Sequence, residues 1–251
     1  MYDISDRSNP VLKRNLVLNG TYQNSRMVGD YIYSIVNVPA YHDRIPLFAP
    51  NQRGFPEINY FAVPSYGYQY TNVLSLNIMN DDQDIQNKVF LLGYSSNLFV
   101  SENNIYMVYQ KQLEESYIFY RIFDEAYAPV LPSEVVSEIN SIRNSGKSEF
   151  RKRGEIQLVM EDWAQSNPEQ SVQFYQNVQK KYDEIQTQFD RERDKSVIHK
   201  ISIKDGNIDY VAQGEVPGQP LNQFSMDEKD GYFRIATTTN NWREQPNNNL
   251  Y

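Results

Sequence analysis

The chain contains no cysteine and only two histidines, His42 and His199, in 251 residues. Zinc, iron–sulfur, haem-thiolate and cysteine-nucleophile chemistries therefore lack their usual ligands. No run of residues approaches the ~20 apolar residues that a transmembrane helix needs. The first residues show no basic stretch followed by an apolar one, so this chain carries no recognisable secretory signal.

Positive charge is also scarce, since 24 basic residues face 32 acidic ones and the net charge is −8. Binding to nucleic acid irrespective of sequence needs Lys and Arg to displace phosphate counterions, so the charge balance argues against this class of function. Tyrosine is abundant instead, with 20 residues. Tyrosine favours strands and packs a broad face while its hydroxyl reaches water, so the composition indicates a β-rich protein.

The chain repeats a sequence pattern that predicts a strand, a tight turn and a second strand ending on aromatic residues. The copies are NSRMVGDYIYSIV (24–36), NLFVSENNIYMVY (97–109) and, with one extra residue, FSMDEKDGYFRIA (224–236). The predicted turns, which need positive φ, are Gly29-Asp30, Asn103-Asn104 and Asp230-Gly231. Such self-similarity indicates a repeat architecture, and each copy resembles the two inner strands, a and b, of a β-propeller blade.

Two outer strands, c and d, complete each predicted blade. After the first copy, alternating apolar residues predict a strand through 74–78 and another at 86–93. After the second copy, strands are predicted at 197–203 and 208–216, joined by Asp205-Gly206. At the start, 2–5 and 11–18 indicate the c and d strands of a further blade.

The segment 111–196 has a helical pattern. Asn167 and Pro168 are typical of a helix start, and a helix is predicted over 167–194. Its apolar residues step by three or four positions and predict one buried stripe. The stripe comprises Val172, Tyr175, Val178, Tyr182, Ile185 and Phe189.

These patterns predict a mainly β protein with an α-helical insertion. We expect a partial β-propeller of about three four-stranded antiparallel blades, with a helical bundle inserted between strands b and c of one blade. The predicted domains are 1–110 (propeller blades, with a long b–c loop at 38–70), 111–196 (helical insertion) and 197–251 (the c and d strands and the next a and b strands).

Three stretches carry a family resemblance: the opening 2–33, the strand pair 101–109, and VIHKISIKDGNIDYVAQGEVPGQPLNQFSMDEKDGYFRIATTT (197–239). They closely resemble the secreted archaeal and bacterial proteins with a C-terminal β-propeller domain distantly related to WD repeats. The resemblance extends over essentially the whole chain, which is similar to a fragment of such a protein. It implies an exported or surface propeller of six or more blades and supplies no catalytic residues.

The excursions 38–70 and 111–196 both leave strand b and return at strand c, so we expect them on one face of the ring. Long loops on a scaffold commonly carry function, and aromatic platforms suit sugar rings or peptides. The alternative is that these rings only pin the loop to the blade. The predicted binding residues are Tyr41, His42, Arg44, Phe55, Tyr60, Tyr66, Tyr68 and Tyr70.

A second candidate site is the central channel, where the inner strands bring polar side chains together. Such a lining binds a small ligand or ordered water. The predicted channel residues are Ser25, Arg26, Asn97, Asn222 and Gln223. No metal site is predicted in the channel, and the only calcium candidates are Asp81, Asp82 and Asp84, for which a solvated turn is the alternative.

The function predicted from these observations is a non-catalytic binding or scaffold module, secreted or at the cell surface, that engages protein or glycan through the b–c face. His42-Asp43-Arg44 lacks an identifiable nucleophile, which argues against catalysis. The alternative is a secreted hydrolase that uses carboxylates as glycosidases do. Unpaired strand edges of a partial ring also predict self-association.

Overall fold

The computed structural model describes residues 1–40, 57–61, 67–94, 97–240 and 245–251. The predicted binding residues Tyr41, His42, Arg44, Phe55 and Tyr66 lie outside these described residues. The chain forms two compact units: a β unit made of 1–112 and 194–251, and a helical unit made of 113–193. The helical unit is thus an insertion between the two chain segments of the β unit.

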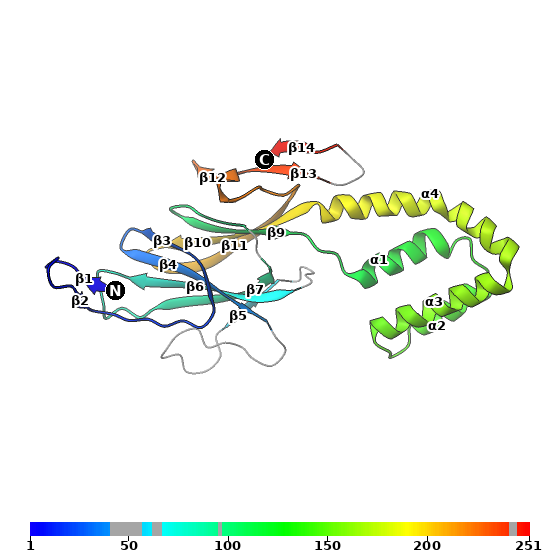
Figure 1. The fold of residues 1–251 in the computed structure, drawn as a ribbon, viewed down its shortest axis with the longest axis horizontal. Helices are drawn as coiled ribbons and strands as arrows, with labels where there is room; N and C mark the ends of the chain where they lie inside the picture. Colours follow the sequence, from blue (N-terminus) through cyan, green and yellow to red (C-terminus); the bar gives the residue numbers. More distant parts are fainter. Residues whose placement is uncertain (41–56, 62–66, 95–96, 241–244) are drawn as a thin grey trace. The chain divides into compact units, whose positions relative to one another are not determined.

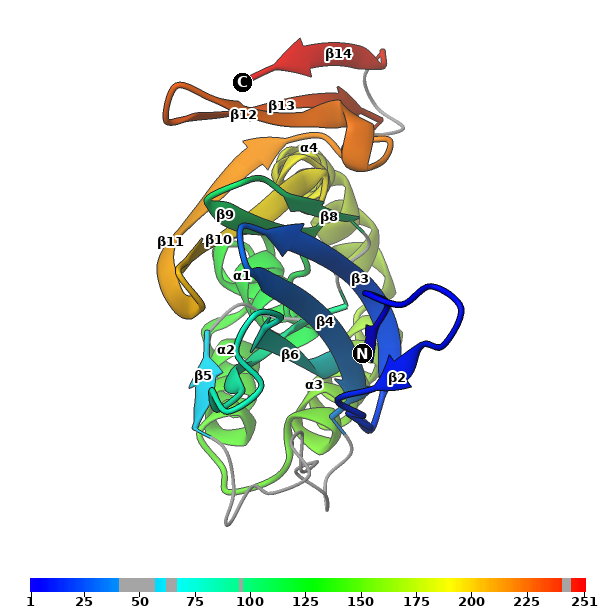
Figure 2. The ribbon, with the colours of Figure 1, turned by 90° about the vertical axis from the view of Figure 1, so that its left-hand side faces the viewer.

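Four separate sheets build the β unit (Figures 1 and 2). Their strand orders are β1-β2, β3-β4-β6-β7-β5, β11-β10-β9-β8 and β12-β13-β14, and the described strands close no ring. The strand bounds are β1 Tyr2–Asp3, β2 Val11–Leu12, β3 Thr21–Val28, β4 Tyr31–Pro39, β5 Ile58–Tyr60, β6 Tyr68–Asn77, β7 Gln86–Gly93, β8 Asn97–Val100, β9 Asn104–Gln110, β10 Lys195–Lys204, β11 Asn207–Pro217, β12 Met226–Lys229, β13 Tyr232–Thr239 and β14 Asn247–Leu250.

The structure departs from the predicted strand set in two places. The strand expected over 11–18 shrinks to Val11–Leu12, because the chain beyond it bonds to the N-terminal residue: the Lys13 and Arg14 N–H groups donate to the Met1 carbonyl at 3.0 and 3.3 Å. The Arg14 side chain donates to the Gln83 carbonyl at 3.2 Å. The sheet that begins with β3 gains an unpredicted fifth strand, β5, which pairs in parallel with β7.

The three copies of the repeated sequence pattern form antiparallel hairpins, β3-β4, β8-β9 and β12-β13. Gly29, Asp230 and Gly231 have the positive φ expected of their turns. The prediction for the second turn was wrong by one residue. Val100 pairs with Ile105, so Glu102-Asn103 occupies the centre, and the Ser101 hydroxyl accepts the N–H of Asn104 at 2.9 Å. The Ser101 hydroxyl therefore stabilises this turn, which does not use a residue with positive φ.

The sheet containing β9 lies between its two neighbours (Figures 1 and 2). Alternate residues of β9 point to opposite faces. Ile105 and Met107 join the core formed with Tyr33 and Phe90 of the preceding sheet. Tyr106 joins the core formed with the following sheet, where its ring stacks on Phe233 with centroids 3.9 Å apart. Apolar burial on both faces therefore holds the three sheets together.

The turn between β10 and β11 fits against the preceding sheet at a glycine. The Gly206 N–H donates to the buried hydroxyl of Tyr33 at 3.0 Å. Gly206 has φ of 84°, and a Cβ atom there would lie 2.4 Å from the Tyr31 ring. Both the backbone conformation and the close approach therefore require glycine.

We expect Gly206→Ala to lower the free energy of unfolding by about 1–3 kcal/mol, because the substitution strains φ and displaces the Tyr31 ring. Gly214→Ala is the control, since Gly214 lies in β11 with ordinary φ and no atom near its would-be Cβ. Urea denaturation measures both variants. Equal stability of the two variants would contradict the role assigned to Gly206.

The helical unit contains α1 (Glu115–Ile122), a π-helical turn (Phe123–Tyr127), α2 (Ser133–Arg143), α3 (Glu149–Ser166) and α4 (Pro168–Arg193). Its core has two clusters. One contains Phe123, Leu131, Ile139, Ile156, Phe174 and Val178, and the other contains Leu113, Ala126, Ile185 and Phe189. The unit therefore has an apolar interior of its own.

The helix predicted over 167–194 is confirmed, but two of the six residues of its predicted buried stripe, both in the first turns, were wrong. Val172 and Tyr175 are exposed, at 59% and 53%, whereas Phe174 is buried. The buried positions run through Ser171, Phe174 and Val178, and then Ile185 and Phe189. Each residue rotates about 100° around a helix, so a shift of one position moves a side chain off the buried face.

Val178→Asp should unfold the helical unit, because a carboxylate would replace a methyl-bearing side chain that is 4% exposed. Val172→Asp on the same helix should leave stability unchanged, because that side chain is in water and near the helix N-terminus. Helical circular dichroism during thermal unfolding distinguishes the two. Loss of helicity in Val172→Asp would show that the observed buried face is wrong.

Candidate ligand-binding cavity

Three of the predicted aromatic binding residues lie in the described part of the chain. Tyr60 in β5 is 59% exposed. Tyr68 and Tyr70 are half-buried in β6, where Tyr70 pairs with Val38 and Leu91. Only Tyr60 among these three presents most of its surface to solvent.

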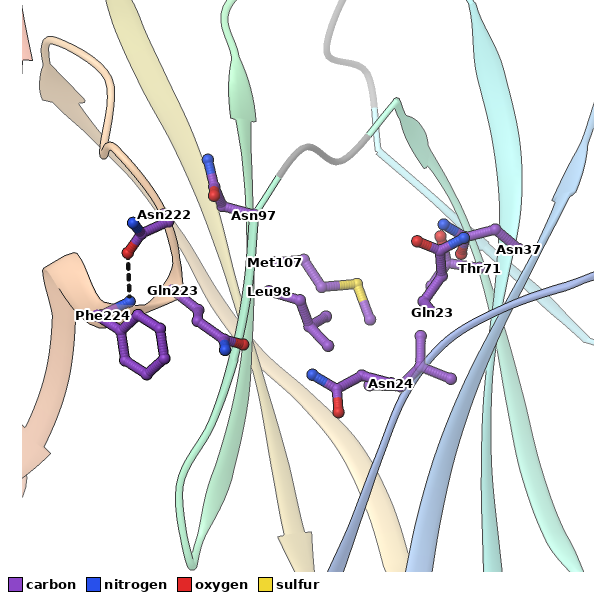
Figure 3. Close-up of a pocket in the computed structure, with 11 residues that line it drawn as sticks. Gln23, Asn24, Asn37, Thr71, Asn97, Leu98, Met107, Asn222, Gln223 and Phe224 are labelled. Carbon is purple, nitrogen blue, oxygen red and sulfur yellow. Dashed lines mark hydrogen bonds between the residues drawn. The ribbon is translucent and has the colours of Figure 1, made fainter.

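The predicted channel residues line two adjoining cavities in the β unit. The first cavity has a volume of about 350 Å³ and contains Asn97, Asn222 and Gln223. Figure 3 shows β8 and the segment before β12 on one side of it and β3, β4 and β6 on the other. The remaining lining residues are Gln23, Asn24, Ile35, Asn37, Thr71, Leu98, Met107 and Phe224. Two sheets and the segment before β12 therefore line one cavity.

A short 3-10 turn, Gln223–Ser225, positions the residues that precede β12. The side-chain oxygen Oδ1 of Asn222 accepts the Phe224 N–H at 2.9 Å, as an N-cap does (Figure 3). The Asn97 amide donates to the carbonyl of Pro220 at 3.5 Å and so connects β8 to this segment. Phe224 is 86% exposed. The cap therefore presents an aromatic ring at the rim of the cavity.

The wall on the opposite side contains two buried polar side chains that the sequence did not single out. Asn37 and Thr71 are 8% and 1% exposed, and they sit opposite each other on β4 and β6. Neither Asn37 Oδ1 nor Thr71 Oγ1 has a hydrogen-bond partner. An unpaired buried polar atom is costly, so these atoms mark a place where a polar group from outside the chain would be stabilised.

The second cavity, also of about 350 Å³, contains Ser25 and Arg26 together with Phe99 and Val100. It shares Asn24, Gln223 and Phe224 with the first cavity. The two cavities therefore adjoin each other beside β8. The structure thus brings together the five channel residues predicted from the sequence.

Among the described lining residues of both cavities there is no carboxylate and no histidine. The nearby acid Glu228 is engaged elsewhere, since it accepts the Asn104 amide at 2.7 Å and the Ser101 hydroxyl across the sheet boundary. Burial and Glu228 raise the pKa of Tyr106 above its usual range. Glu228 therefore connects the sheet of β12 to the sheet of β9 and does not line either cavity.

The calcium candidates lie on an exposed turn after β6. Asn77 organises the start of this turn, because its side-chain oxygen Oδ1 accepts the N–H groups of Met79 and Asn80 at 2.8 and 3.0 Å. Across the described residues, no cluster of three or more acidic, histidine or cysteine side chains could hold a metal ion. Calcium binding at Asp81, Asp82 and Asp84 stays a prediction.

His199 is a buried residue of β10, with no exposed surface, and it lies away from both cavities. Its Nε2 is 2.8 Å from the Tyr109 hydroxyl, and its Nδ1 is 3.3 Å from the Tyr210 hydroxyl. The Phe61 ring packs 4.8 Å away between centroids. Burial lowers the pKa of His199 to about 4, so its ring is neutral and structural at pH 7.

The free energy of unfolding should fall as pH decreases from 6.5 to 4, because the unfolded chain binds a proton at His199 that the folded protein rejects. The full contribution is present above pH 6.5, and about 3 kcal/mol is lost across this range. His199→Gln should remove this part of the pH dependence. Urea denaturation at several pH values tests it, and an unchanged slope in the variant would refute the assignment.

The comparisons with known proteins agree with this architecture. A family model described as the beta propeller domain matches residues 1–251, so the chain belongs to the beta propeller domain family. This confirms the resemblance found in the sequence. No solved structure matches the chain.

Two archaeal relatives are similar over long alignments. The chain is 27% identical over 260 residues to uncharacterized protein MJ1554 of Methanocaldococcus jannaschii, covering 100% of this chain and 41% of that protein. It is 28% identical over 171 residues to an uncharacterized protein of Archaeoglobus fulgidus, covering 67% of this chain and 26% of the relative. The chain therefore spans less than half the length of either relative.

Proposed function

We propose that this chain is a non-catalytic binding module, secreted or at the cell surface, that engages protein or glycan. The observation that carries the proposal is the cavity along β8, whose described lining is uncharged apart from Arg26. Asn and Gln amides donate and accept hydrogen bonds without acting as general acids or bases. Such a lining supports recognition and offers little for proton transfer.

The blade assignment is part of this proposal. The strands β3, β4, β6 and β7 correspond to a, b, c and d of one blade, and β8, β9, β10 and β11 correspond to those of the next. The helical unit then leaves between b and c of the second blade, since β9 and β10 pair directly. The exposed Tyr60 of β5, in the segment that joins b to c of the first blade, would contribute to a second, macromolecular contact face.

The hydrolase alternative needs two carboxylates about 5–10 Å apart in a cleft. The described residues of the two cavities provide none. Membrane attachment through a helix of this chain has no support either, because none of the described helices is long and apolar enough to cross a bilayer. Binding is therefore the function that the geometry favours.

The purified chain should bind members of an immobilised panel of neutral glycans and peptides. Replacing Asn24 and Gln223 by Ala should weaken that binding at least tenfold, because both amides line both cavities. Asn207→Ala is the control, since Asn207 is an exposed amide at the start of β11, outside the cavity lining. Biolayer interferometry measures the affinities.

An unaltered affinity in the double variant would refute binding at the cavity. The same glycans should be incubated with the chain and assayed for new reducing ends. Their release at a rate that falls in the double variant would overturn the non-catalytic assignment.

A further inference from the structure

We propose that the first cavity binds the ring of a neutral sugar, with the buried Asn37–Thr71 pair reading its hydroxyl groups and Phe224 packing on its apolar face. This inference rests on the proposed binding function and specifies its ligand. It follows from three features of the cavity: the unpaired polar atoms, the composition of the walls and the exposed aromatic ring.

The unpaired atoms suit a hydroxyl group. Asn37 Oδ1 is an acceptor, and Thr71 Oγ1 both donates and accepts. They lie on directly paired residues of β4 and β6, so one ligand group can meet both. A sugar hydroxyl donates one hydrogen bond and accepts others, and it would satisfy both atoms. An ion fits this cavity less well than a hydroxyl group, because no described lining residue of the first cavity carries a compensating charge.

The remaining walls suit the rest of such a ring. Gln23, Asn24, Asn97, Asn222 and Gln223 surround the cavity with amides, and their composition selects a neutral, multiply hydroxylated ligand. Ile35, Leu98 and Met107 add an apolar surface. A volume of about 350 Å³ falls near the lower end of the about 300–1,000 Å³ found for small-molecule sites. One sugar ring is therefore the appropriate size.

Phe224 completes the match, because a sugar ring has an apolar C–H face as well as polar edges. A phenylalanine ring that is 86% exposed has little role in the folded core. The backbone that carries it is held by the Asn222 cap, because Asn222 Oδ1 accepts the Phe224 N–H at 2.9 Å. The ring also borders the second cavity, so an oligosaccharide could extend past it toward Ser25.

The proposal is tested with Thr71→Val, which removes the unpaired hydroxyl and keeps the shape of the side chain. Because that hydroxyl has no partner, the thermal midpoint should stay unchanged or rise. The neutral monosaccharides tested are glucose, galactose, mannose and N-acetylglucosamine. Those that bind the unaltered chain should bind the Thr71→Val variant about fivefold or more weakly. Saturation-transfer NMR titrations of the full chain measure this.

Thr237→Val is the matched control, since Thr237 is equally buried, at 3% exposure, but its hydroxyl already donates to the Pro217 carbonyl at 2.6 Å. It should lower the thermal midpoint and leave sugar affinity unchanged. Phe224→Ala should also weaken sugar binding about fivefold or more, whereas Phe150→Ala, at an equally exposed ring of the helical unit, should not.

Triglycine amide serves as the peptide probe. If it binds and responds to Thr71→Val while the sugars do not, the sugar assignment is overturned and the binding function stands. If no probe binds, both proposals fail. Sugar binding that is unaffected by Thr71→Val overturns the placement of the sugar on the buried pair.

Discussion

Burial of β9 on both of its faces is the constraint on which the rest of the β unit depends. Ile105 and Met107 pack toward one neighbouring sheet, and Tyr106 and Val108 toward the other. Each apolar side chain fully removed from water contributes about 1.5–3 kcal/mol. Because the period of a strand is two, a register slip of one residue would exchange the two faces and disrupt both cores. This strand therefore fixes β8, and with it the cavity wall.

The same strand explains how a large helical unit is accommodated. Gln110 at the end of β9 pairs with Ser196 at the start of β10. The Lys111 N–H donates to the Lys195 carbonyl at 2.8 Å, and both lysines approach Glu215. The excursion thus leaves and returns at paired positions, so the ladder continues as though joined by a short turn. The helical unit contributes its own core and leaves the sheet register unchanged.

Much of the fold could be predicted because its signals are local. The three hairpins follow from alternation and turn residues, and the long helix follows from Pro168 and its apolar spacing. The errors arise where nonlocal or side-chain bonding intervenes. Hydrogen bonding by Ser101 shifts the turn of the second hairpin by one residue. The apolar Val172 and Tyr175 fit the helical pattern although more than half of each side chain is exposed. The parallel pairing of β5 with β7 has no local signal at all.

Only part of the candidate site was predictable from the sequence. Asn97, Asn222 and Gln223 follow from their place at the start of inner strands. Asn37 was missed, although it continues the inward positions of Tyr33 and Ile35 and interrupts their apolar pattern. A polar residue at a position where the strand period demands an apolar one is a usable signal, because burial without a partner opposes folding.

The polar Asn37 in the apolar pattern of β4 also indicates that different residues of the cavity have different roles. An unpaired buried polar atom costs about 1–3 kcal/mol in the free protein, and a ligand that supplies the missing partner recovers part of this energy on binding. A ligand that lacks the partner recovers none of it, so the Asn37–Thr71 pair discriminates between ligands more than it adds affinity. Phe224 is exposed at the rim, where Asn222 holds its backbone N–H, and its ring contributes apolar contact area. Selectivity and affinity thus arise from different walls of the same cavity.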